Sequence, residues 1–142
     1  MLTQVEADTL LATGKLFVDE VTIYFSPGLD ETHELTSDDG NERFLLDLWR
    51  GTIRLSKLKY QNRCRGAIIL ARLDIDGAPH TNPDGAQLSG THLHLYREGY
   101  EDKWAFPLDP HKFTAKADPG KTFAEFCSFC NIQQPPTQGS LV

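Results

Sequence analysis

Three histidines lie within fifteen residues of one another, and their neighbours can move protons or hold an anion. His80 comes first, and one residue separates His92 from His94. Imidazole changes charge near neutral pH and is the commonest metal ligand. Arg72 and Asp74 lie shortly upstream, and a guanidinium can hold an anionic group through two hydrogen bonds. These residue types indicate general acid and base chemistry on a bound anion.

Strand alternation brings these side chains to one surface. Alternate residues of a strand share a face, so the even-numbered side chains from His92 to Tyr96 emerge together and the two leucines between them face the core. The strand over 66–75 has the same alternation. If it pairs with 91–97, its polar side chains join this surface. The predicted catalytic residues are His80, His92, His94, Tyr96, Arg72 and Asp74.

The connection 77–90 is expected to lie over or beside this polar surface. Its segment Asn82-Pro83-Asp84-Gly85 is typical of a type I turn, with proline second and glycine fourth. Such a turn would hold His80 in a defined loop, where functional groups often lie.

Two other interpretations of the histidines stay open. They can be hydrogen-bonding residues on a solvated sheet face, or ligands of a metal-binding enzyme that uses His80, His92, His94 and Glu98. Acid–base chemistry needs no ion, so we expect no metal and no cofactor.

Basic residues are concentrated in one short stretch of an acidic chain. The net charge is −6, yet seven of the 14 lysines and arginines lie between residues 43 and 65. This stripe can bind phosphates, or it can pair with the acidic N-terminal third. The predicted nucleic-acid-binding residues are Arg50, Arg54, Lys57, Lys59, Arg63 and Arg65.

The elements predict an α+β fold. Thr3 and Glu6 form a capping box for a first helix that Gly14 ends, and short β-type runs follow to about residue 108. A second helix is predicted over 122–131, with a capping box of Thr122 and Glu125. The short runs leave no room for helical crossovers, which favours an antiparallel meander of five to seven strands with a helix near each terminus. Arg50 and Gly51 would turn a hairpin between strands 44–49 and 52–60.

Residues 1–132 are expected to form one domain, and 133–142 a flexible tail. No apolar run approaches the roughly 20 residues that cross a bilayer, and no signal peptide is apparent. Three cysteines are an odd number, which favours reduced thiols in the cytoplasm. Cys127 and Cys130 lie late in the second helix and are predicted to pack in the core rather than to act in redox chemistry.

The chain resembles an uncharacterised family of short bacterial and prophage proteins, to which no activity is assigned. The stretches that carry the resemblance are 72–85, 90–105, Leu46-Asp47-Leu48, Tyr60-Gln61-Asn62-Arg63 and Phe126 to Ile132.

Two shorter patterns resemble other proteins. Toxin components of toxin–antitoxin systems carry an Arg-x-Asp, a Pro/His turn and a His-x-His, matched here by Arg72, Asp74, Pro79, His80, His92 and His94. Thr81 stands where those proteins have a second histidine. The spacing of His92, His94 and Glu98 is similar to the first cupin metal motif, but no second motif follows.

Three functions follow as hypotheses. The first is a site that binds or cleaves RNA or another phosphate-bearing ligand; the second is a non-enzymatic protein that binds a protein or nucleic-acid partner. The third is a small cupin-like metal enzyme. No membrane partner is expected.

Overall fold

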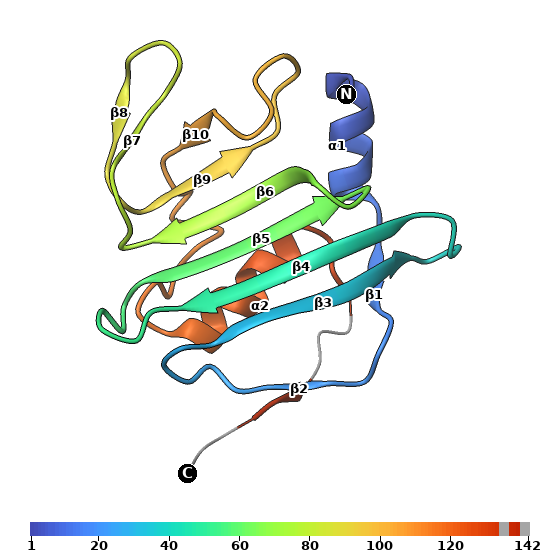
Figure 1. The fold of residues 1–142 in the computed structure, drawn as a ribbon, viewed down its shortest axis with the longest axis horizontal. Coiled ribbons are helices and arrows are strands. Elements are labelled where there is room, and N and C mark those ends of the chain that lie inside the picture. The colour runs from blue at the N-terminus through green and yellow to red at the C-terminus, as the bar shows by residue number, and fades with distance from the viewer. Residues whose placement is uncertain (134–136, 140–142) are drawn as a thin grey trace.

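The computed structural model describes residues 1–133 and 137–139 and confirms the predicted α+β class (Figure 1). Its centre is a seven-stranded antiparallel sheet. In spatial order the strands are β1 (Lys15–Phe17), β3 (Asp30–Ser37), β4 (Arg43–Arg50), β5 (Leu58–Cys64), β6 (Ile68–Ile75), β9 (His92–Leu95) and β10 (Ala105–Phe106). Two short pairs stand apart, β7 (His80–Thr81) with β8 (Gln87–Leu88) and β2 (Thr22–Ile23) with β11 (Thr137–Gln138).

Helix α1 (Gln4–Ala12) begins as the sequence predicts. The Thr3 side chain accepts a hydrogen bond from the Glu6 amide, and the Glu6 carboxylate accepts one from the Thr3 amide, so the capping box is confirmed. The helix ends at Ala12, two residues before Gly14.

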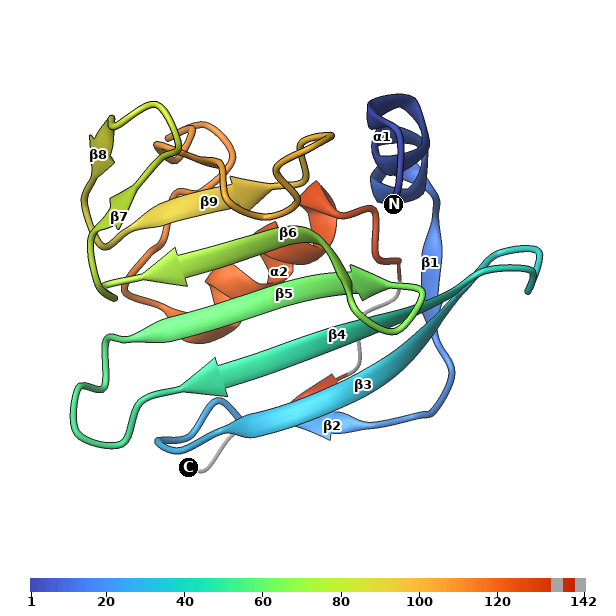
Figure 2. The same cartoon turned by 45° about the horizontal axis from the view of Figure 1, so that its top comes forward.

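Helix α2 (Pro119–Phe129) lies across one face of the sheet, behind β4 and β5 in Figure 1, and Figure 2 shows the same arrangement after a rotation. It begins three residues earlier than predicted. Asp118 caps it by accepting from the Lys121 amide, and Pro119 occupies the first turn, where a missing N–H costs nothing. The predicted capping box is therefore wrong, and Glu125 accepts hydrogen bonds from Thr114 instead.

The core fills the space between the sheet and α2. The ring of Tyr60 on β5 meets Phe123 of α2 edge to face, with centroids 6.0 Å apart. Cys64, Cys127 and Cys130 are buried and free, which confirms the predicted packing of the last two. Burial raises the pKa of all three thiols, so they are poor nucleophiles.

One fully buried lysine joins the two helices. The Lys15 ammonium donates hydrogen bonds to three main-chain carbonyls, those of Leu11 and Thr13 at the end of α1 and that of Cys130 at the end of α2. Its three N–H donors are thereby satisfied at the points where helices leave carbonyls unpaired.

The connection between β4 and β5 is longer than predicted. Strand β4 ends at Arg50 and β5 begins at Leu58, so the expected strand start at 52 is wrong. The Arg50 guanidinium donates to the carbonyls of Phe25 and Leu55, and these bonds order residues 51–57 as a loop.

Part of the predicted tail pairs with the body of the protein. β11 runs parallel to β2, and the Gly139 amide donates to the Ile23 carbonyl. Residues 134–136 and 140–142 of that segment lie outside the described residues. Neither helix, over the described part of the chain, has the length and apolar character needed to cross a membrane.

Candidate functional site

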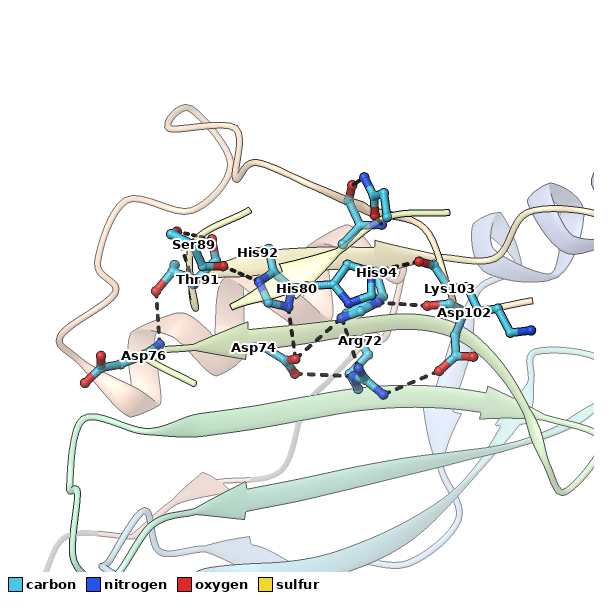
Figure 3. Close-up of polar contacts among 12 residues, drawn as sticks. Arg72, Asp74, Asp76, His80, Ser89, Thr91, His92, His94, Asp102 and Lys103 are labelled. Atoms are coloured by element: carbon cyan, nitrogen blue, oxygen red, sulfur yellow. Dashed lines mark hydrogen bonds and ion pairs between the residues drawn. The ribbon is translucent and has the colours of Figure 1, made fainter. Parts of the chain in front are cut away.

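The register of β6 and β9 builds the polar surface that the sequence predicts. The strands are antiparallel, with Arg72 opposite His94 and Asp74 opposite His92. On the other side of β6, Lys59 of β5 lies opposite Asp74. Because the alternate residues of these strands fill the core against α2, this row faces away from that helix (Figure 3).

The β7–β8 hairpin adds the third histidine. The His80 ring centroid lies 4.6 Å from that of His94 and 5.6 Å from that of His92, and His80 Nε2 contacts the Lys103 carbonyl at 2.8 Å. The Asn82 side chain holds the hairpin to β10, because its amide donates to the Ala105 carbonyl and its oxygen accepts from the Ala105 amide.

The base of the hairpin depends on a close approach of two glycines. The Gly77 amide donates to the Gly90 carbonyl, and a Cβ on Gly90 would lie only 2.0 Å from the Gly77 oxygen. The expected position of the 77–90 connection beside the polar face is confirmed, since residues 77–80 form one wall of the pocket. His92 and His94 are each only 1 % exposed, so these two residues do not lie on a solvated sheet face, which was one of the alternative interpretations.

Main-chain carbonyls fix the orientation of both imidazoles. His92 Nδ1 lies 2.6 Å from the Ser89 carbonyl, and His94 Nδ1 lies 2.8 Å from the Asp102 carbonyl. A carbonyl can only accept, so each Nδ1 carries the proton and each Nε2 is directed toward Asp74. The Asp74 Oδ2 atom lies 3.2 Å from His92 Nε2 and 3.5 Å from His94 Nε2.

Arg72 completes the cluster from β6. Its Nη2 atom lies 2.9 Å from His94 Nε2, its Nε 3.3 Å from Asp74 Oδ1 and its Nη1 3.4 Å from Asp102 Oδ2. A guanidinium only donates, so His94 Nε2 acts as the acceptor in this contact. The sequence analysis missed Asp102, because nothing in its spacing marks a loop residue that reaches back to β6.

The surroundings of Asp74 favour its ionised form. Burial raises the pKa of Asp74, but the facing His94 ring, the Arg72 guanidinium and the His92 ring outweigh burial and hold the pKa below its ordinary value. Among the described residues, Asp74 Oδ1 and Arg72 Nε are buried polar atoms without a hydrogen-bond partner, although the two face each other as an ion pair. Buried atoms of this kind are exceptional, and strain, a catalytic role, a bound water or an ion can account for them.

Arg72 and Asp74 line a pocket of about 240 Å³. Lys57 and Lys59 line it together with Arg72, so three cationic side chains face one carboxylate, Asp74. Lys57 Nζ lies 5.6 Å from the Trp49 ring centroid. Within the described ranges, the side chain of Lys59 has no ion pair and no hydrogen bond.

The predicted nucleic-acid-binding stripe separates into two groups. Its arginines are occupied elsewhere: Arg63 pairs with Asp47, Arg65 with Glu42 and Arg54 with Asp76, while Arg50 orders a loop. The two lysines line the pocket. Nucleic-acid binding by this stripe stays a prediction. Because the arginines are already paired, Lys57 and Lys59 are the stripe residues best placed to bind a phosphate.

Two candidate residues lie away from the cluster. Strand β9 ends at Leu95, so Tyr96 leaves the alternation; it is buried, donates to the Leu2 carbonyl and accepts from the Leu2 amide. The Glu98 carboxylate accepts from the Gln4 amide, so neither residue lines the pocket.

The cluster can hold a cation or an anion. One ligand atom each from Asp74, His92 and His94 lies within 4.8 Å of the other two, a spacing that suits a metal ion. The lysines and Arg72 suit an anionic group on the open side.

Comparisons with known proteins give a family but no activity. No curated protein matches the chain, and no solved structure matches it. Residues 2–132 match the family described as "Family of unknown function (DUF6978)". This match spans both helices and the whole seven-stranded sheet, and the chain belongs to that family.

Proposed function

We propose that Asp74, His92 and His94 bind a divalent metal ion, with zinc as the best fit, and that the protein is a metal-dependent hydrolase. The observation that carries this proposal is the convergence of two Nε2 atoms on one ionised carboxylate oxygen, at 3.2 and 3.5 Å. Zinc binds nitrogen and oxygen at about 2.0–2.1 Å, which separates tetrahedral ligand atoms by about 3.3 Å.

The surroundings of the imidazoles support the same assignment. A metal-ligating histidine nearly always donates its other ring N–H to a carbonyl or carboxylate, as both rings do here. His92 Nε2 faces Asp74 Oδ2 at 3.2 Å, and a metal ion between them can take both atoms as ligands. Imidazole and carboxylate ligands together favour zinc over magnesium or calcium.

The ligand count favours a reactive site over a structural one. Structural zinc sites have four protein ligands, whereas catalytic sites have three and keep one position open. Here three ligands adjoin a pocket. Bound zinc would act there as a Lewis acid on a carbonyl or phosphoryl group.

Arg72 must change one contact when the ion binds. Its Nη2 atom occupies the His94 Nε2 lone pair that the metal needs. The guanidinium retains Asp74 Oδ1 and Asp102 Oδ2 as partners, at 3.3 and 3.4 Å. The site therefore contains a built-in competitor for one ligand atom.

Zinc titration by calorimetry tests the proposal, on protein purified without a histidine tag and stripped by a chelator. We expect one ion per chain, and at least a 100-fold loss of affinity in His92→Ala and in the near-isosteric Asp74→Asn. His111→Ala is the matched control, because His111 is an exposed histidine outside the pocket.

Equal zinc affinity in the wild type, His92→Ala and Asp74→Asn would overturn the proposal, as would the absence of binding in folded wild-type protein. Circular dichroism establishes that each variant is folded. Metal-free acid–base catalysis on RNA would then be the better interpretation of the histidines. A bacterial or prophage origin, a cytoplasmic location and the likeness to toxin components stay predictions.

A further inference from the structure

We propose that the pocket over Asp74 holds the phosphate group of a phosphate-bearing ligand, contacted by Lys57, Lys59 and Arg72, and that anion and metal strengthen each other's binding through Arg72. The phosphate pocket depends on the three cations alone. The coupling rests on the metal site proposed above.

The charge of the pocket is the first observation. Three cationic side chains line it, and Asp74 is the only carboxylate among its lining residues. Lys59 is brought there by the register, which places it opposite Asp74 on the neighbouring strand. Lys57 has no ion pair among the described residues, although its charge helps to lower the pKa of Asp76 and its ammonium lies 5.6 Å from the Trp49 ring centroid.

The contrast with the rest of the basic stripe is the second observation. Arg54, Arg63 and Arg65 are each neutralised by a carboxylate within 3.0 Å. These three arginines outside the pocket each form an ion pair, whereas the two pocket lysines form none among the described residues. Selective pairing of this kind concentrates unbalanced positive charge at one place.

The size of the pocket identifies which part of a ligand it takes. Pockets for whole drug-sized molecules measure about 300–1,000 Å³, whereas this one measures about 240 Å³. It therefore suits a head group, with the rest of the ligand outside. Phosphate fits better than carboxylate, because it has enough oxygens to meet two ammonium groups and a guanidinium separately.

Arg72 couples the two ligands. Its Nη2 atom donates to His94 Nε2 at 2.9 Å. A phosphate in the pocket draws the guanidinium toward its own oxygens and frees the Nε2 lone pair for the metal. Binding free energies are reciprocal, so the metal must strengthen phosphate binding by the same factor.

Calorimetry with AMP tests the pocket, and adenosine is the uncharged control. We expect AMP to bind and adenosine not to bind. Loss of one charge-assisted contact costs about 1.5–3 kcal/mol, so Lys59→Gln should weaken AMP binding about 10- to 100-fold while the variant still binds zinc. Arg43→Gln is the matched control, because Arg43 is a stripe residue that does not line the pocket.

A double titration tests the coupling. We expect AMP to raise zinc affinity, zinc to raise AMP affinity by an equal factor, and both effects to vanish in Arg72→Gln. Zinc binding with no AMP coupling overturns the coupling and leaves the metal site intact. AMP binding that is lost in Lys59→Gln, with no zinc binding, supports the pocket and overturns the metal site.

A single-stranded oligoribonucleotide distinguishes a phosphodiester from a terminal phosphate. Binding of the oligoribonucleotide but not of AMP, lost in Lys59→Gln and kept in Arg43→Gln, would support the pocket and identify a phosphodiester. If neither probe binds the folded wild type, with or without zinc, the phosphate pocket does not exist.

Discussion

Asn82→Ala should detach the β7–β8 hairpin from the sheet. Asn82 is 8 % exposed and makes two hydrogen bonds with the main chain of Ala105, a residue that is 2 % exposed. The variant leaves a buried N–H and a buried C=O without partners, at a cost of about 1–2 kcal/mol for each group. The expected loss in the free energy of unfolding is therefore about 2–4 kcal/mol.

Urea unfolding measures this loss, and the reactivity of histidines toward diethyl pyrocarbonate reports on the hairpin. In Asn82→Ala we expect His92 and His94 to react faster, because the hairpin wall beside them opens. Gln87→Ala is the control, since Gln87 is exposed on the same hairpin. A variant within about 0.5 kcal/mol of the wild type, with unchanged histidine reactivity, would refute the anchoring role.

Three further changes probe other parts of the structure. Gly90→Ala should lower the melting temperature strongly, because the new Cβ would lie 2.0 Å from the Gly77 oxygen. Gly77→Ala is the control and should change the melting temperature little, because its Cβ would lie 3.7 Å from the nearest atom. Equal shifts in the two variants would contradict this reasoning. Tyr96→Phe loses both hydrogen bonds with the main chain of residue 2 and should cost about 1–3 kcal/mol, with faster amide exchange at the start of α1; unchanged exchange would speak against it.

The third change concerns pH. Burial raises the pKa of Asp47, but hydrogen bonds led by the one from Arg63 outweigh it and lower the pKa. Because the folded-state pKa lies below the unfolded value, the carboxylate stabilises the fold above the unfolded pKa of about 3.9, and this contribution is lost as the pH falls through the folded-state pKa. Asp47→Asn should therefore flatten the acid limb of the stability profile in urea unfolding, and a limb as steep as that of the wild type would exclude this role.

The polar face at the centre of the site can be predicted from sequence alone. Period-two alternation at 92–95 and at 69–75 predicts which face of each strand is polar, but a register shifted by two residues would bury the same apolar faces. The structure supplies the register that puts Asp74 beside His92. Alternation alone does not show where the strand ends, so it predicts Tyr96 on a face that the side chain does not reach.

What the sequence could not show are contacts made by main-chain atoms and by distant loops. The carbonyls of Ser89 and Asp102 orient the imidazoles, yet every residue has a carbonyl and no pattern marks these two. Pairing of the basic stripe with the acidic N-terminal third was one of the two alternatives, and Arg65 with Glu42 fits it. Asp76 and Asp47, which pair with Arg54 and Arg63, lie outside that third, and no sequence pattern marks them as partners. At α2 the sequence contains two possible N-terminal caps, Thr122 with Glu125 and Asp118 with Pro119. In the structure the helix begins at Pro119 with Asp118 as its cap.

The buried ammonium of Lys15 couples the stability of the two terminal helices. It donates hydrogen bonds to the carbonyls of Leu11 and Thr13 and to the carbonyl of Cys130, which lies 119 and 117 positions further along the sequence. Local unfolding of either helix would leave the buried Lys15 ammonium with too few hydrogen-bond acceptors, so neither helix is expected to unfold independently. The outer segments of the chain are thereby expected to open as one cooperative unit, even though a whole sheet separates them along the polypeptide.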